Sequence, residues 1–131
     1  MTTTSEDQTV QLGDLKITLQ APQSYALRWD VATAGATMPT RALAAALAAC
    51  WPRKPRWPGE SRKRPRPTYE GCGHQVGTYG GAVIDWLTSQ GVTMPEIAYA
   101  GTVAYHLLAD GLFGESEVQT AEDFSDPPEG A

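Results

Sequence analysis

The feature that most constrains this chain is a helical corner between Val83 and Asp110. Apolar and small side chains recur there at the three- and four-residue spacing that places them on one face of a helix. They are Val83 and Leu87 before the corner, and Ile97, Ala100, Gly101, Ala104, Leu107 and Leu108 after it. This spacing predicts two helices, each with one apolar side. Two such helices must bury those sides against each other and against a further element.

The corner itself carries the signals that end one helix and begin the next. Gly91 supplies the left-handed residue that ends a helix without a steric clash at Cβ. Thr93 and Glu96 have the spacing of a capping box, and Pro95 lies in the first turn, where a missing N–H costs nothing. We therefore expect Thr93 to cap the second helix.

The same corner occurs earlier in the chain. Gly35-Ala36-Thr37-Met38-Pro39 matches Gly91-Val92-Thr93-Met94-Pro95 at the Gly, Thr, Met and Pro positions. These residues are common at the ends of helices in general. Two independent helix corners are therefore a better explanation of the match than an internal duplication. The expected fold is mainly α, a small bundle of four to five helices formed by two helical hairpins. Its structural corner residues are Gly35, Thr37, Pro39, Gly91, Thr93 and Pro95.

The N-terminal region predicts a short β-hairpin over about residues 9–20. Apolar residues alternate with polar ones on both sides of a Gly13-Asp14 turn; they are Val10, Leu12, Leu15, Ile17 and Leu19. A two-stranded ribbon is marginal alone, so its apolar face must lie on the helices or pair with strands of another copy. The second arrangement would produce oligomers.

Helix boundaries follow from caps and breakers. Ser24 is expected to cap a first helix that ends near Gly35, and the second helix runs from Pro39 or Thr40 to about Trp51. Gly80 and Gly81 interrupt the third helix pattern. Each costs about 1 kcal/mol relative to alanine in a helix, so we expect them to permit close backbone packing.

After the fourth helix, we expect Gly111 to end the helical run and Leu112-Phe113 to fold back on the core. Ser116 and Gln119 are placed to cap one further short turn.

The length of 131 residues indicates one domain, which we place at residues 1–114, followed by an acidic and largely flexible tail at 115–131. Alanine fills most of residues 42–49, which favours helix but buries little area per residue. Such a thin core favours a partner surface or a homo-oligomer. The N-terminus has no signal-peptide pattern and no apolar run is long enough to span a bilayer, so we expect a cytoplasmic protein without membrane contact.

The net charge of −5 conceals a strong segregation. One segment holds seven of the ten cationic residues; they are Arg53, Lys54, Arg56, Arg62, Lys63, Arg64 and Arg66. The tail holds only acidic residues; they are Glu115, Glu117, Glu122, Asp123, Asp126 and Glu129. Five prolines and repelling charges predict an extended, mobile loop over 52–68, with Trp51 and Trp57 exposed.

The cysteines and histidines do not indicate an enzyme. Cys72 and His74 lie two residues apart, whereas a catalytic pair is normally assembled from distant segments, and no orienting carboxylate stands at recognisable spacing. Cys50 and His106 complete the inventory without the paired spacing of a zinc site. We expect no metal and no cofactor. Both cysteines are expected to be reduced thiols, although the sequence leaves a single bridge open.

Nucleic-acid binding through residues 53–66 is the main alternative. The cations with Trp51 and Trp57 have the chemistry to neutralise phosphates and stack a base. The acidic balance of the whole chain opposes approach to a polyanion, and the helix after Gly91 carries no Lys or Arg for a DNA-reading role. A solvated loop whose charge offsets the tail is the simpler interpretation.

The layout resembles the small tail assembly chaperones of long-tailed bacteriophages. The resemblance rests on the N-terminal strand pair, the alanine-rich middle, and the acidic end. Its motifs are Tyr79-Gly80-Gly81, Thr88-Ser89-Gln90-Gly91-Val92 and Asp123-Phe124-Ser125. It implies a non-enzymatic protein that binds the tape-measure protein in the host cytoplasm; a structural virion component is a further alternative. We expect the apolar hairpin faces to bind a helical partner, while the basic loop and acidic tail set orientation and salt dependence.

Overall fold

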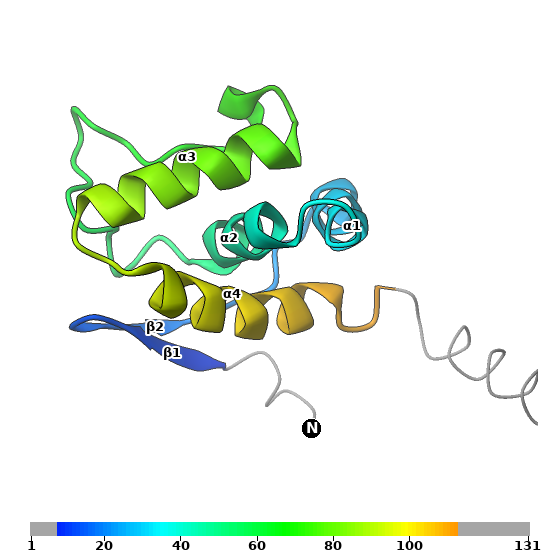
Figure 1. The fold of residues 1–131 in the computed structure, drawn as a ribbon, viewed down its shortest axis with the longest axis horizontal. Helices are drawn as coiled ribbons and strands as arrows, with labels where there is room; N and C mark the ends of the chain where they lie inside the picture. The colour runs from blue at the N-terminus through cyan, green and yellow to red at the C-terminus, as the bar shows by residue number, and fades with distance from the viewer. Residues whose placement is uncertain (1–7, 113–131) are drawn as a thin grey trace, which may run out of the picture.

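A computed structural model describes residues 8–112 as a helical domain with an N-terminal β-hairpin (Figure 1). The elements in chain order are β1 (Thr9–Leu12), β2 (Leu15–Thr18), α1 (Tyr25–Ala34), α2 (Pro39–Cys50), the short 3-10 helix η2 (Glu70–Cys72), α3 (Val76–Ser89) and α4 (Met94–Ala109). The prediction of a mainly α fold with an N-terminal β-hairpin is confirmed. The described residues form four α-helices where four to five were expected. Phe113, the further turn expected at Ser116 and Gln119, and the tail at 115–131 lie outside the described residues.

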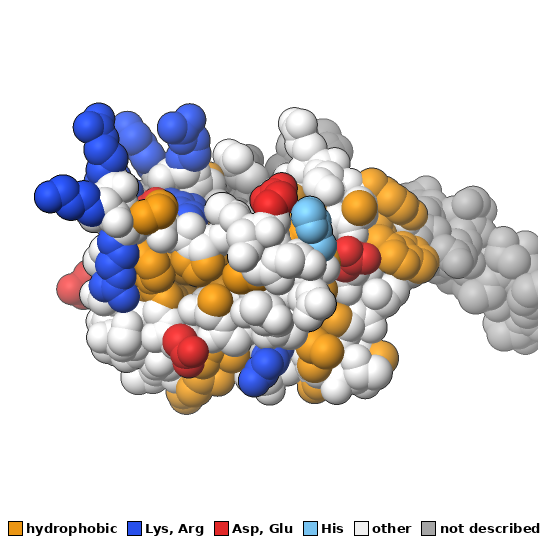
Figure 2. Space-filling view, turned by 90° about the horizontal axis from the view of Figure 1, so that it is seen from above, with side chains coloured by type: hydrophobic (Ala, Val, Ile, Leu, Met, Phe, Trp, Pro, Cys, Tyr) orange, Lys and Arg blue, Asp and Glu red, His pale blue; other side chains and the backbone are white. Residues whose placement is uncertain are grey.

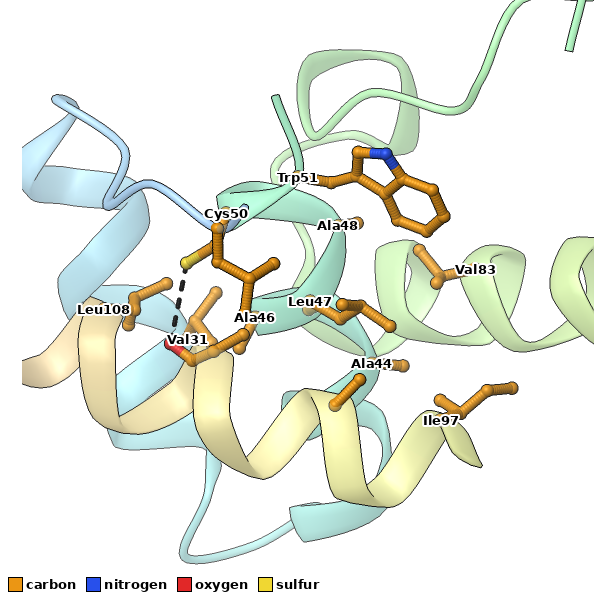
Figure 3. Packing of buried hydrophobic residues seen from close by; sticks show 14 of the residues in the cluster. Val31, Ala44, Ala46, Leu47, Ala48, Cys50, Trp51, Val83, Ile97 and Leu108 are labelled. Carbon is orange, nitrogen blue, oxygen red and sulfur yellow. Dashed lines mark hydrogen bonds between the residues drawn. The ribbon is translucent and has the colours of Figure 1, made fainter. Parts of the chain in front are cut away.

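The alanine-rich helix α2 is the central element of the fold. Figure 1 shows it between α3 and α4, with α1 beside it. Its buried side chains are Ala42, Ala44, Ala45, Ala46, Leu47, Ala48 and Cys50. Small side chains on α2 let both neighbours approach closely, so α3 and α4 pack mainly on α2 instead of on each other. The core around α2 is shown in Figure 3.

Two glycines make this close packing possible. A Cβ on Gly80 of α3 would lie 2.2 Å from the backbone oxygen of Arg41, and a Cβ on Gly101 of α4 would lie 2.6 Å from that of Leu43. Both contacts are with backbone atoms, which cannot turn away as a side chain can. The close approach expected at Gly80 is therefore confirmed, whereas Gly81 meets only the side chain of Arg41 at ordinary contact distance.

The β-hairpin covers α4 with its apolar face. β1 and β2 are antiparallel, with Val10 opposite Ile17 and Leu12 opposite Leu15. Val10, Leu12 and Ile17 are buried, and the N–H of Gly13 donates to Glu96 at the start of α4, 3.3 Å away. Of the two arrangements open from the sequence, packing on the helices is the one found within this chain.

The corner at Gly91 has the predicted geometry. Gly91 has a φ of 92°, and the N–H groups of Gly91 and Val92 donate to the carbonyls of Thr88 and Leu87. These two bonds form a Schellman motif. The Thr93 hydroxyl accepts from the N–H of Glu96, and the Glu96 carboxylate accepts from the N–H of Thr93 at 2.9 Å. The capping box is thus confirmed.

The corner at Gly35 is different, and the prediction that it has the same geometry as the corner at Gly91 is wrong. Gly35 is right-handed, with a φ of −58°, and Thr37 does not cap the next helix. The carbonyl of Ala34 accepts from the N–H groups of both Thr37 and Met38, so the chain continues its turn and breaks only at Met38. Met38 occupies the N-cap position without a side-chain bond, and Pro39 begins α2.

The remaining boundary signals act as expected. The Ser24 hydroxyl accepts from the N–H of Leu27 and caps α1. Gly111, with a φ of 73°, follows the end of α4, and Leu112 is buried against the core. The Arg28 side chain of α1 donates to the carbonyls of Leu108 and Asp110, which ties α1 to the end of α4.

Candidate functional site

The most distinctive surface of the molecule is formed by six exposed cationic side chains between α2 and α3. We call this set the basic surface; it consists of Arg53, Lys54, Arg56, Arg62, Lys63 and Arg64. Figure 2 shows Lys and Arg side chains gathered at one end of the molecule. In the part of the chain that the structure describes, none of the six lies within ion-pair distance of a carboxylate. Their charge is therefore available to an external anion.

Arg66, the seventh cation of the segment, has an internal role. Its guanidinium forms two hydrogen bonds with the Glu60 carboxylate, at 2.9 and 3.1 Å, and donates to the carbonyls of Pro52 and Arg53 at 2.9 and 3.1 Å. The Glu60 carboxylate also accepts from the N–H of Trp57 at 2.7 Å. Arg66 and Glu60 thus clamp the segment into a closed turn, and Arg66 does not belong to the surface offered to a partner.

Partial burial acts to raise the pKa of Glu60. The hydrogen bonds from Arg66 and Trp57, with the positive charges of Arg66 and Arg56, outweigh it and hold this pKa below its usual value. Glu60 is therefore charged at neutral pH, and its charge is compensated by Arg66.

Three tryptophans hold the segment on the helices. Trp51 and Trp57 pack at 5.2 Å between ring centroids, and Trp57 meets the edge of Trp86 on α3 at 5.8 Å. Trp57 is 1% exposed and Trp51 4%, so the expectation that these tryptophans are exposed is wrong. Burying their large apolar rings against the helices is more favourable in free energy than leaving them in solvent.

Polar bonds from two indoles add to this attachment. The indole N–H of Trp86 donates to the carbonyl of Pro58 at 2.7 Å, and that of Trp51 donates to Pro55 at 2.8 Å. The segment contains no helix or strand, as its prolines predict, but it is folded back on α3. Whether it moves in solution stays a prediction.

A hollow of about 500 Å³ opens among the cations. Its lining includes Arg53, Lys54, Arg56 and Arg62, together with the clamped Glu60. Beside it, the Arg64 guanidinium lies over the Trp86 ring at 4.4 Å from the centroid, which fixes the position of this charge. The arrangement can accept carboxylate or phosphate oxygens by hydrogen bonds from several directions. It cannot stack a base on Trp51 or Trp57, because both rings are buried.

The charge of the described part differs from that of the whole chain. Residues 8–112 hold all ten Lys and Arg but only seven Asp and Glu, a formal charge of +3. The flanking residues hold the other eight acidic side chains and no Lys or Arg. The net charge of residues 8–112 taken alone therefore does not oppose the approach of a polyanion.

The apolar faces of the helices are not a partner surface. Val83, Leu87, Ile97 and Leu108 are fully buried in the chain's own core, so the expectation that these faces bind a helical partner is wrong. Large apolar side chains that remain exposed in the described part are Tyr25, Trp29, Met38, Met94 and Tyr99.

The cysteines and histidines lie in separate surroundings. Cys50 and Cys72 are free thiols, so the single bridge left open by the sequence is not formed. Burial raises the pKa of Cys50 to about 12, and its thiol donates to the Ala104 carbonyl at 3.5 Å, drawn as the dashed line in Figure 3. The His74 ring meets Tyr69 edge-on. Among residues 8–112, no three His, Cys, Asp or Glu side chains lie close enough together to hold a metal ion.

Among the helices that the structure describes, none combines the length and the apolar character needed to cross a bilayer.

Sequence reasoning missed two residues of the site, Glu60 and Trp86. Glu60 is the only acidic residue between Arg53 and Arg66, and a lone carboxylate among cations is a usable signal for an ion pair. Trp86 gave no comparable signal, because its position on the apolar pattern of α3 does not reveal which segment covers it.

Comparison with known proteins gives no match that bears on the function of this site. No family model matches the chain, and no curated protein or solved structure shows significant similarity to it.

Proposed function

We propose that the protein is a non-enzymatic binding protein that contacts an anionic partner through its basic surface. The observation that carries this proposal is the pairing pattern of the loop. In the described part, the one carboxylate within ion-pair distance of the segment's cations is bound to Arg66, while six further cations project outward unpaired. Like charges this close repel each other, and an anionic partner relieves that repulsion.

Support for a partner surface also comes from the attachment of the segment. The tryptophan contacts and the Arg66–Glu60 clamp hold the backbone that carries the cations. A surface held in advance loses less conformational entropy on binding than a free loop does.

The resemblance to tail assembly chaperones suggests which protein the partner is. In this proposal the client is the tape-measure protein, and acidic segments of the client bind the basic surface during virion assembly in the host cytoplasm. Self-association of the chaperone on the client is compatible with this role.

The test is a co-expression pull-down with the tape-measure protein of the same phage. A fourfold variant, Arg53→Ala, Lys54→Ala, Arg62→Ala and Lys63→Ala, is expected to lose capture, because these side chains are exposed and make no ion pair in the described part. Lys16→Ala removes an exposed cation from β2 and is the control that keeps capture. Undiminished capture by the fourfold variant contradicts the proposal.

Nucleic acid is the second candidate partner, favoured by the formal charge of +3 on residues 8–112. Phosphate contacts without base stacking predict binding that is independent of sequence and falls steeply with salt. Each cation removed from the contact is expected to reduce the slope of log K against log salt by about 1. Absence of binding to a labelled DNA duplex at low salt removes this candidate.

A further inference from the structure

The basic surface lies at one end of the domain, and the described chain leaves α4 at the other. Pro58 and Arg64 contact Trp86, near the C-terminal end of α3. α4 begins close to that end and runs away from it (Figure 1). The described chain ends at Leu112, and residues 113–131 follow it.

The following segment matches the basic surface in charge. It carries Glu115, Glu117, Glu122, Asp123, Asp126 and Glu129, and it has no Lys or Arg. Six carboxylates therefore stand in the same chain as six exposed cations without an ion pair in the described part. Sets of opposite charge in one molecule attract each other even in water, most strongly at low salt.

The length of the segment is sufficient for a return to the basic surface. α4, which has 16 residues, is about 24 Å long. An extended chain spans up to about 3.3 Å per residue, so residues 113–131 reach roughly 60 Å.

Covalent attachment favours the chain's own segment over that of another copy. A tethered segment acts at an effective concentration in the millimolar range, far above ordinary protein concentrations.

We propose that the acidic segment 113–131 binds the basic surface of its own chain through ion pairs. Its consequence for activity rests on the proposed function: an anionic partner has to displace the acidic segment, which acts as an internal competitor. This competition would restrict binding to partners of higher charge density or higher local concentration than the segment itself.

Zero-length carbodiimide cross-linking of the full chain tests the contact, because it leaves no spacer and joins a lysine amine only to a carboxylate that comes into direct contact with it. The chain has three lysines: Lys54 and Lys63 belong to the basic surface, and exposed Lys16 on β2 is an internal control. We expect Lys54 and Lys63 to be joined to residues 115–129 in several-fold higher yield than Lys16, with the yield falling as salt is added. Equal yields at all three lysines overturn the proposal.

Mixing isotopically labelled and unlabelled protein distinguishes the two sources of the segment. In an equimolar mixture, cross-links confined to one isotopic form support binding in the same chain. Mixed cross-links that approach half of the total, the share that random pairing between copies produces, overturn it in favour of a second copy.

A full-chain variant with all six acidic residues changed to amides provides a second readout without cross-linking. Acetylation of Lys54 and Lys63 is expected to be several-fold faster in this variant than in the wild type, while Lys16 is unchanged. Equal rates overturn the proposal. Neither measurement needs a partner, so failure of the pull-down leaves these expectations in place, and their failure leaves the partner proposal standing.

Discussion

The two helix corners of this protein have nearly the same sequence and different structures. At the second corner, Gly91 is left-handed and closes a Schellman motif, and Thr93 caps α4. At the first, Gly35 is right-handed, and α2 begins at Pro39 without a side-chain cap. Relative to the shared motif, the helix starts one residue later at the first corner.

The glycines are required for different reasons. A Cβ on Gly91 would meet no atom within 4 Å, so glycine is needed there for its backbone angle. A Cβ on Gly35 would lie 2.5 Å from the Tyr105 hydroxyl, so any side chain there requires the tyrosine ring to shift, and space is what favours glycine. That hydroxyl donates to the Ala32 carbonyl and links α4 to α1.

The shared five-residue motif therefore does not by itself determine the residue at which the next helix begins. The second corner has Glu96 three residues after Thr93, which completes the capping box. The first has Thr40 three residues after Thr37, with no carboxylate to reach back. Without that reciprocal bond, tertiary contacts decide where the helix begins.

Gly35→Ala is expected to have the largest effect. It should lower the free energy of unfolding by about 2 kcal/mol, because the new methyl group displaces Tyr105 from its bond to Ala32. Urea denaturation measures the change. Combining it with Tyr105→Phe, which removes the nearest atom, should cost less than the sum of the two single changes. Additive costs would contradict the steric explanation.

Gly91→Ala should cost about 1 kcal/mol, from the left-handed backbone alone. Gly91→Asn should cost less, since asparagine tolerates this conformation better. At Gly35 the order is reversed, because asparagine is larger than alanine and space is what limits that site. Equal ranking of Ala and Asn at the two corners, by the same denaturation measurement, would refute the distinction.

Thr93→Ala should lower the free energy of unfolding by about 1 kcal/mol through loss of the N-cap. Thr37→Ala is the matched control at the other corner and should leave the denaturation midpoint nearly unchanged. A comparable loss at Thr37 would show that it caps α2 after all.

Glu96→Gln is expected to have the smallest effect, and it depends on pH. Hydrogen bonds from the backbone N–H and hydroxyl of Thr93 lower the pKa of Glu96 in the folded state. A lowered pKa adds stability above the unfolded-state pKa, and this stability is lost as pH falls through the folded value. The wild type should therefore exceed the variant at neutral pH and converge with it in acid. A difference that is independent of pH would contradict a charge effect.

The candidate site was predictable in its charge but not in its attachment. Clustering of Arg53 to Arg66 in the sequence identified the basic segment directly. The same segment suggested exposed tryptophans, because prolines and charges describe only its own composition. Trp57 is buried by Trp86 from α3, and no local pattern specifies that contact.

The features that were predictable from the sequence are local. They are the strand alternation, the helical spacing, the Ser24 cap and the capping box of Thr93 and Glu96. Each depends on residues only a few positions apart, so it can be recognised without knowledge of the rest of the fold. Tertiary structure alone decided the central place of α2, the space required at Gly35 and the division of the cations into Arg66 inside and six outside. These depend on which distant surfaces meet, and that is set by shape and buried area summed over the whole core.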